Sequence, residues 1–241
     1  MSYNYKDSKA NIINIIKTGI PIEKKQTIPA NKKFTYNNGI RCPVSAIFVD
    51  IVNSSLLFKD KDLRVANIIR SLTSELIKMF QHLPNRNQVG IRGDCVYAIC
   101  STPNLKHVNK IFKIAVKVNT FMDMFNKLLA QYNYPQINIG IGLGCDDDEL
   151  IIKAGRSGTG TNDKIWIGKA VVDASKLSSI ANRRNHANIA MNSLFYKKIK
   201  QTNVCENNLI EPSNDYDYFD SNFYECDLVQ DDFFDWIQKE V

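Results

Sequence analysis

The chain alternates between short apolar runs and longer stretches in which apolar residues recur every three or four positions. A run such as Ser45–Val49 is typical of a buried strand, whereas the longer pattern in 61–83 is typical of an amphipathic helix. These patterns predict an α+β sandwich with the helices on one face of a sheet. The predicted strands are 45–49, 88–92, 95–99, 137–143, 149–154 and 187–191, and the predicted helices are 61–83, 104–132, 169–181 and 192–199.

Turn residues set the connections between these elements. Gly93-Asp94 separates two short strands, which predicts a β-hairpin with a type II′ turn. The acidic run 146–148 predicts a bend between two further strands, and a Gly-rich loop is expected over 155–163. Residues 155–160 superficially suggest a phosphate-binding loop, but the terminal Gly-Lys-Ser/Thr is missing, so a flexible loop is expected instead.

The two ends of the chain differ from its middle. Residues 1–40 are rich in Lys and Asn, with a short helix candidate at 11–17, and we expect an arm that packs late or pairs with a partner chain. Residues 205–241 carry 11 acids and one base, a charge of −10 against +16 for 1–204. Because eight aromatic residues in this tail are costly to leave in water, we expect it to pack on the central domain, 41–204. A tail that binds another protein is the alternative.

Composition narrows the classes of function. Hydrophobic residues make up 44% of the 241 residues, and no apolar run reaches the ~18–20 residues that span a bilayer. There is no signal-peptide pattern at the start, and the six cysteines include no CxxC pair, so a cytoplasmic protein without membrane contact, zinc site or disulfide framework is expected. The net charge of +6 would suit nucleic acid. However, Lys and Arg are dispersed and no recognition helix is evident, so no stable nucleic-acid partner is expected.

Two acidic residues stand where predicted strands end. Asp50 follows the buried run 45–49, and Asp94 lies in the hairpin turn. Each alone is also a common helix-cap or turn residue. Since neighbouring strands lie ~4.8 Å apart, a strand end and an adjacent hairpin tip can direct both carboxylates at one ion. Mg²⁺ prefers such oxygens and leaves positions for substrate phosphates, as in two-metal phosphoryl transfer.

Four motifs, in order and at matching spacing, resemble those of the class III nucleotidyl cyclases over roughly residues 42–200. The chain departs from the family pattern at Asn53, where Gly is usual, and at Val172 and Lys176, where Asn and Arg are usual. The resemblance implies the cyclase catalytic fold, a ferredoxin-like βαββαβ core with added strands and helices. The motifs are Phe48-Val49-Asp50-Ile51-Val52-Asn53-Ser54-Ser55, Gly93-Asp94, Gly140-Ile141-Gly142 and Trp166-Ile167-Gly168-Lys169-Ala170-Val171-Val172-Asp173-Ala174-Ser175-Lys176-Leu177.

The resemblance also assigns roles by position. It implies that Asp50, Asp94 and the backbone carbonyl of Ile51 bind two divalent cations, Mg²⁺ or Mn²⁺. Lys176 would replace the transition-state Arg, although Lys lacks the forked donors of Arg, and a solvated helix lysine is the alternative. Val172 is interpreted as core packing. The family further implies a head-to-tail homodimer, whose composite sites take carboxylates from one protomer and the late helix from the other.

Four positions bear on the nucleotide base. Gly90 and Ile165 stand where purine cyclases of the family carry polar base-reading residues. Phe48 could stack on a base, and Arg92 offers donors for the carbonyl oxygens of uracil, although strand core and surface are their plainer interpretations. The chain therefore resembles the Pycsar uridylate cyclases of bacterial anti-phage defence. This implies UTP as substrate, cyclic UMP as product and an effector that acts through the product. A cytidylate or adenylate cyclase, or an inactive nucleotide-binding module, stays open.

Overall fold

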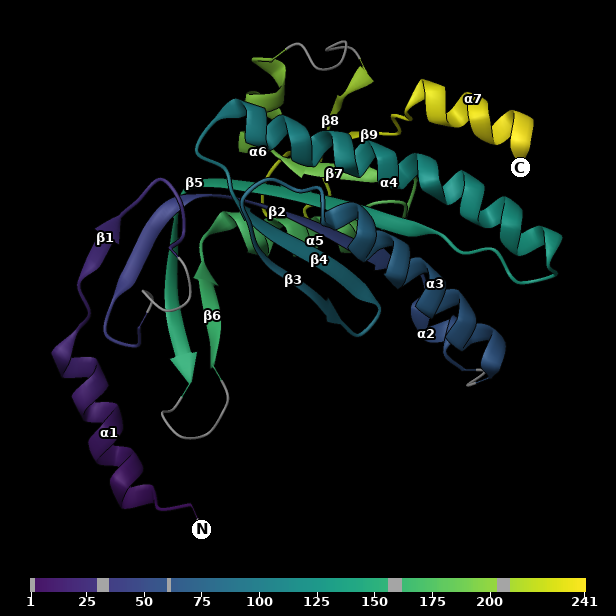
Figure 1. Cartoon of the computed structure of the whole chain (residues 1–241). Coiled ribbons are helices and arrows are strands. Elements are labelled where there is room, and N and C mark those ends of the chain that lie inside the picture. The colour runs from purple at the N-terminus through teal and green to yellow at the C-terminus, as the bar shows by residue number, and fades with distance from the viewer. Residues whose placement is uncertain (1–2, 30–34, 60–61, 156–161, 203–208) are drawn as a thin grey trace.

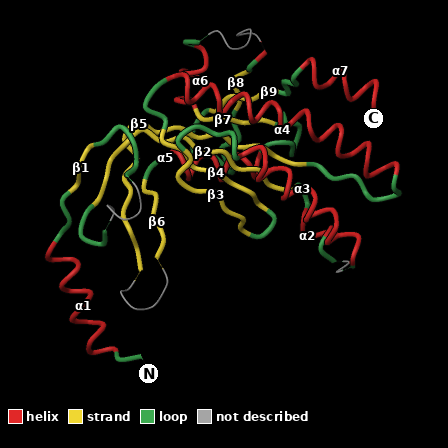
Figure 2. The backbone as a smooth tube through the Cα atoms, in the orientation of Figure 1, coloured by secondary structure: helices red, strands yellow, loops and turns green. Residues whose placement is uncertain are grey.

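One mixed sheet organises the chain, and helices cover both of its faces (Figures 1 and 2). The computed structural model describes residues 3–29, 35–59, 62–155, 162–202 and 209–241. The helices are α1 (Tyr5–Thr18), α2 (Ser54–Leu57), α3 (Leu63–Phe80), α4 (Leu105–Gln131), α5 (Lys169–Ile180), α6 (Ser193–Lys200) and α7 (Asp231–Glu240). The strands are β1 (Ile22–Lys24), β2 (Gly39–Ile51), β3 (Arg86–Arg92), β4 (Cys95–Ser101), β5 (Ile139–Gly155), β6 (Asn162–Ile167), β7 (Ile189–Asn192), β8 (Glu211–Ser213) and β9 (Phe223–Cys226).

The sheet follows the order β3-β4-β2-β5-β7-β9-β8, with β1 added to β2 and β6 added to β5. The succession β2–α3–β3–β4–α4–β5 is the predicted βαββαβ core, so the α+β class is confirmed. β2 lies at its centre, antiparallel to both β4 and β5, and nearly all of its side chains are buried. Asp50 therefore ends a central strand, whereas Asp94 lies in the hairpin that joins β4 to the edge strand β3.

β5 departs from the sequence prediction. The bend predicted at 146–148 is wrong, because β5 runs through these residues and its second half pairs with β6 rather than with its own first half. The acidic side chains can stay in a strand because each has a partner: the Lys169 N–H for Asp146, Lys198 for Asp147 and Arg41 for Asp148. Residues 156–161 of the predicted Gly-rich loop lie outside the described residues.

One face of the sheet is covered by α3 and α4, which lie in front of it in Figure 1. Asp62 caps α3, with its side chain accepting the Val65 N–H at 2.9 Å. Every fourth residue of α3 is then buried, which is the stripe that an amphipathic helix turns toward a core. This stripe is Ile68, Leu72, Leu76 and Phe80. It belongs to one core cluster with Phe112 of α4 and with the alternate residues of β5 that face the same way, Ile139, Ile141 and Leu143.

The opposite face carries α5, so the prediction that all helices lie on one face is wrong. The residues of β5 that alternate with the apolar ones are Gly140, Gly142 and Gly144. A Cβ on Gly142 would lie 2.0 Å from the Ala174 carbonyl oxygen, and one on Gly144 would lie 2.0 Å from that of Ala170. The helix backbone therefore rests directly on the strand, which only glycine permits.

The C-terminal region continues the sheet. β9 pairs antiparallel with β7, and β8 pairs with β9. Phe223 and Ile237 are fully buried, and Lys127 of α4 donates to the Ile237 carbonyl at 3.2 Å. Within the described parts of the chain, no helix is both long enough and apolar enough to cross a bilayer.

Candidate functional site

The candidate site begins where β2 and the β3–β4 hairpin end together. Val49 pairs with Val96 and Arg92 pairs with Cys95, so Asp50 lies beside Cys95 and close to the turn that holds Asp94. Gly93 has φ +64°, as the first central residue of a type II′ turn requires. Backbone pairing thus brings two residues 44 positions apart in the sequence to one end of the sheet.

The electrostatic interaction between Asp50 and Asp94 also indicates that the two carboxylates lie close together. Burial raises the pKa of the Asp50 carboxyl above its ordinary value, and the negative charge of Asp94 raises it further. Burial and these two carboxylates also raise the pKa of the Cys95 thiol to about 12. Cys95 is therefore protonated at neutral pH. The chemistry of this corner is carboxylate chemistry.

Arg183, which the sequence analysis missed, lies against this corner. Its Nη2 donates to Asp50 Oδ2 at 2.9 Å and to the Ile51 carbonyl at 3.1 Å. Its Nη1 donates to the carbonyls of Ser178 and Ala181, at 2.9 and 3.2 Å. The guanidinium thus connects the last carbonyls of α5 with the end of β2. The sequence signal is the Asn- and Arg-rich turn after α5, where three non-glycine residues, Asn182, Arg184 and Asn185, have positive φ.

The donor set suits a hard divalent cation. Asp50, Asp94 and the Ile51 carbonyl offer only oxygen, and a cationic group already bridges Asp50 and Ile51 in the form of Arg183. Among the described residues, no cluster of three or more His, Cys, Asp or Glu side chains could hold a metal by itself. A cation here would depend on the backbone carbonyl and on oxygens from a bound substrate.

Beside the carboxylates, aromatic side chains fill the sheet surface. Phe48 is only 8% exposed and stacks on Tyr97, with ring centroids 5.0 Å apart and planes 12° apart. Tyr97 lies over Gly90, where a Cβ would come within 2.5 Å of the Tyr97 hydroxyl. The ring of Tyr97 therefore occupies the space into which a side chain at position 90 would project. The sequence motifs did not single out Tyr97, whose place opposite Phe48 follows from the register between β2 and β4.

A hydrogen-bonded chain fixes Tyr97. Gln88 Nε2 donates to the Tyr97 hydroxyl at 3.0 Å, and Trp166 Nε1 donates to Gln88 Oε1 at 3.1 Å. Arg92 is exposed at the end of β3, on the side of that strand shared with Gly90, and Ile165 is exposed on β6. Phe48, Tyr97 and Arg92 thus share one surface with Asp50.

Lys176 lies apart from the carboxylates. It projects from the outer side of α5 and forms an ion pair with Asp220 of the C-terminal region at 3.6 Å. Val172, one turn earlier, is 46% exposed, so its interpretation as core packing is wrong. Small residues on the opposite side of α5 face the glycines of β5, which leaves Val172 and Lys176 directed outward. Asp173 instead accepts a hydrogen bond from Asn192 Nδ2 at 2.8 Å.

Two carboxylates that the sequence analysis missed hold the start of α5. Asp146 accepts the Lys169 N–H at 2.9 Å, and Glu149 accepts the Ala170 N–H at 3.0 Å. Glu149 is fully buried, and burial raises its pKa to about 7. Its second oxygen, Oε1, has no hydrogen-bond partner among the described residues. This carboxylate anchors the helix and is itself sensitive to pH.

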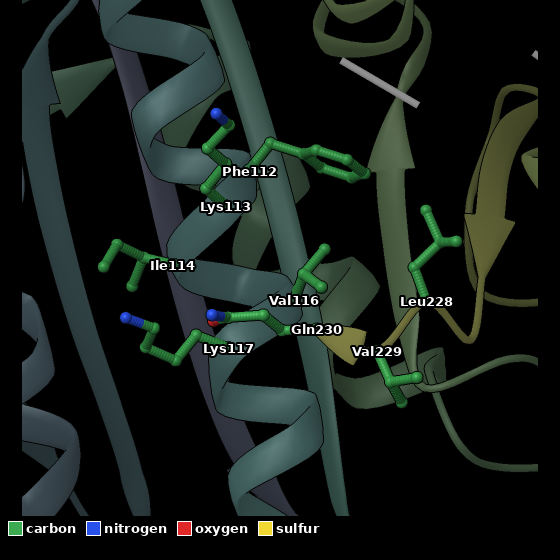
Figure 3. A pocket seen from close by; sticks show the side chains of 8 residues that line it. All are labelled: Phe112, Lys113, Ile114, Val116, Lys117, Leu228, Val229 and Gln230. Atoms are coloured by element: carbon green, nitrogen blue, oxygen red, sulfur yellow. The ribbon is translucent and has the colours of Figure 1, made fainter. Parts of the chain in front are cut away.

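A cavity of about 420 Å³ lies elsewhere, between α4 and residues 228–230 (Figure 3). Its lining combines apolar side chains with Lys113 and Lys117. Neither Asp50 nor Asp94 belongs to it, and α4 covers the face of the sheet opposite to α5. The candidate site is therefore the strand-end corner and not this cavity.

Comparisons with known proteins identify the family to which the chain belongs. Residues 39–206 match the family described as "Adenylate and Guanylate cyclase catalytic domain". A uridylate cyclase from Treponema porcinum is 40% identical over 240 residues, covering 99% of this chain and 82% of that protein. A uridylate cyclase from Gulbenkiania mobilis is 27% identical over 188 residues, covering 75% and 72% of the two chains.

Solved structures show the same fold. The adenylyl cyclase CyaB from P. aeruginosa matches with a TM-score of 0.63 at 16% identity, over 78% of this chain and 94% of that chain. The resemblance carried by the four motifs is thus confirmed. With a family match over more than half its length and a 40% identical relative over nearly all of it, this chain belongs to the adenylate and guanylate cyclase catalytic domains, the class III nucleotidyl cyclases.

Proposed function

We propose that the protein is a uridylate cyclase that converts UTP into 3′,5′-cyclic UMP and diphosphate. The observation that carries the proposal is the convergence of Asp50, Asp94 and the Ile51 carbonyl at one end of the sheet. Two relatives that are named uridylate cyclases support the choice of nucleotide. In the reaction, the ribose 3′-oxygen bonds to the α-phosphorus and gives up its proton, while the bond to the leaving diphosphate breaks.

Asp50, Asp94 and the Ile51 carbonyl would hold the divalent cations, Mg²⁺ or Mn²⁺, of which we propose two. When bound, such ions activate the attacking hydroxyl and neutralise charge on the triphosphate. Asp50 must be ionised for this role, and Arg183 must share or release the Asp50 and Ile51 oxygens that it now contacts. Arg183 would then keep its bonds to Ser178 and Ala181, so that the end of α5 stays in place.

Lys176 would stabilise the negative charge that develops on the α-phosphate. Since Lys176 points outward from α5 and pairs with Asp220, we propose that it serves the carboxylates of a second copy in a head-to-tail homodimer. The exposed Val172 lies on the same outward side of α5 and would contribute apolar contact there. Each of the two sites would thus combine β2 and the hairpin of one protomer with α5 of the other.

Tyr97 gives the proposal its base preference. Its ring lies over Gly90 and stacks on Phe48, and we propose that it thereby narrows the base site and disfavours a purine. The donors of Arg92, at the hairpin end near Asp50, match the carbonyl oxygens of uracil and would face the amino group of cytosine unfavourably. We propose that these three side chains select UTP, and that Phe48 acts mainly by supporting Tyr97.

We further propose a cytoplasmic role in bacterial anti-phage defence, in which an effector recognises the cyclic product. This part of the proposal rests on the family resemblance alone. No stable nucleic-acid partner is proposed.

The deciding experiment incubates the purified full chain with equal amounts of ATP, GTP, CTP and UTP and with Mn²⁺, and identifies ring products by mass spectrometry. Cyclic UMP should dominate. In Arg92→Ala the preference for UTP over CTP should fall about tenfold, as expected for loss of a base-reading hydrogen bond, while Lys59→Ala should behave as wild type. A purine ring as the main product would refute the base assignment, and no ring at all would favour an inactive binding module.

A further inference from the structure

Helix α1 has an apolar side that its own chain does not cover. None of its residues is buried, and Ile16 is 76% exposed. Tyr5, Ile12 and Ile16 follow one line along the helix, with Ile13 and Ile15 on either side, while the Lys and Asn residues lie mostly opposite. Ser8 and Lys9 interrupt this side between Tyr5 and Ile12, but the four exposed isoleucines of the second half gather there, and such a cluster marks an interaction surface.

α1 is also held away from the body. β1, directly after it, pairs in parallel with the start of β2. In Figure 1 the helix extends from this end of the sheet, far from α3 at the other end. The short link over Gly19–Pro21 leaves no length for α1 to reach the far end of its own chain.

A matching groove lies at that far end. α3 has a second apolar line beside its buried stripe, formed by Val65, Ile69 and Ile77. Together with Phe58 and with Ile91 of the edge strand β3, this line borders an open groove of about 750 Å³. Leu56 and Leu63, both exposed, stand near the same end.

The groove and α1 agree in length. The 14 residues of α1 span ~21 Å, and the rise from Val65 to Ile77 along α3 is ~18 Å. Because the helix lies at one end of the molecule and the groove at the other, two copies placed antiparallel about a twofold axis bring each helix to the groove of its partner. Such an exchange is isologous and closes on itself as a dimer.

We propose that α1 of one copy lies in the α3 groove of a second copy, and reciprocally. This rests on the homodimer of the proposed function and adds a contact outside the composite site. Phe58 in the groove follows β2 and α2 directly, so the docked helix would brace the segment after Asp50. The isoleucines of α1 and the groove would be covered at the same time.

The test is sedimentation velocity of the full chain over a range of concentrations. Ile12→Glu/Ile16→Glu in α1 and Ile69→Glu in the groove should each weaken the dimer at least tenfold. Asn14→Glu, on the polar side of α1, and Ser71→Glu, on α3 away from the groove, are the matched controls and should leave it unchanged. Thermal unfolding confirms that each variant is folded.

A mixing experiment with opposite charges tests whether α1 and the groove contact each other directly. Mixing the α1 double Glu variant with Ile69→Lys should restore a heterodimer that neither forms alone. The proposal is overturned if wild type is monomeric throughout, if the groove variant matches Ser71→Glu, or if mixing restores nothing. It is also overturned if α1 instead drives co-sedimentation with vesicles of phosphatidylcholine and phosphatidylglycerol.

The UTP assay runs in parallel on every variant. Ring formation with a dimer insensitive to α1 and the groove would refute this contact and leave the proposed function standing. Loss of the dimer in the α1 and groove variants, with no ring formed even by wild type, would support this contact and refute the proposed function.

Discussion

The two halves of the candidate site are built by different means. At the end of β2, backbone pairing across three strands fixes Asp50 and Asp94, and burial keeps their surroundings dry enough to raise the pKa of Asp50. On α5, Lys176 stands on the outer side of a helix, 46% exposed, with an acidic residue of the same chain as partner. The first half exists within one chain, whereas the catalytic role that we propose for Lys176 depends on a second molecule that faces it.

The contacts within the chain fix the inner side of α5 and leave its outer side free to vary. α5 lies directly on Gly140, Gly142 and Gly144. Its first N–H groups donate to Asp146 and to the buried Glu149, and Arg183 donates to the Ser178 carbonyl near its end. The helix is therefore held firmly on its inner side while its outer side carries the departures from the family pattern. A rigid helix with an altered outer surface is what a composite site requires, since the partner's substrate must meet fixed groups.

The largest effect is expected from substitutions in the strand-end half of the site. Asp50→Ala or Asp94→Ala should lower kcat with UTP by more than about 10³-fold, because the cation oxygens are removed. Product formation is measured by mass spectrometry, and thermal unfolding checks that the fold persists. Asp235→Ala, an exposed carboxylate on α7, is the control and should keep full activity. Wild-type turnover in either variant would remove that carboxylate from the metal role.

Mixing inactive variants tests whether the two halves come from different copies. Asp50→Ala and Lys176→Ala proteins, combined 1:1 and allowed to exchange, form heterodimers in about half of the pairs, each with one intact site of two. Roughly a quarter of wild-type activity should return. No recovery, despite proven exchange, would show that both groups act within a single chain.

A smaller effect is expected from the α5 half alone. Lys176→Ala should lower kcat by about 10²–10³-fold, the usual effect of losing one charge-stabilising donor, with little change in KM. Lys176→Arg should retain activity, since its guanidinium can make the forked contact. Unchanged kcat in the Ala variant would assign Lys176 to the surface.

The anchoring of α5 should depend on pH through Glu149. Its pKa is about 7 in the folded protein against an ordinary 4.5. Below pH 4.5 it is protonated in both states, so its burial adds no charge penalty. As pH rises to 7 the unfolded state loses the proton first, and stability falls by about 3 kcal/mol in all.

Glu149→Gln keeps an acceptor for the Ala170 N–H but cannot ionise. The loss of Tm between pH 5 and pH 8 should therefore be smaller in this variant than in wild type. Glu240→Gln, exposed at the end of α7, should show the wild-type slope. Equal slopes for all three proteins would mean that Glu149 does not titrate in this range.

The smallest effect concerns the tail contact of Lys176. Both side chains of the Lys176–Asp220 ion pair are exposed, and such surface pairs contribute little to stability. Asp220→Asn should change kcat by no more than about twofold, in the direction of higher activity. A large rise in kcat would show that the C-terminal region restrains Lys176, which would bring the two halves of the site under common control.

The sequence by itself determined the elements and the carboxylate pair. Helical and alternating spacings gave α3, α4, α5 and the β3–β4 hairpin close to their observed bounds, because each of these elements buries a stripe that its own periodicity reveals. Asp50 and Asp94 were predictable for a similar reason. A strand end and a tight turn are local features, and their pairing follows from adjacency in a hairpin-built sheet.

Only the tertiary structure decided what meets across the sheet. The uninterrupted β5 depends on partners for Asp146–Asp148 that come from distant elements, and the side on which α5 packs depends on three glycines whose meaning appears only with a helix against them. Arg183 and Tyr97 were missed for the same reason: each acts through contacts with residues far away in sequence, and neither the Arg-rich turn after α5 nor strand alternation shows what those contacts are. Periodicity records which side of an element is buried, but it does not record which element buries it.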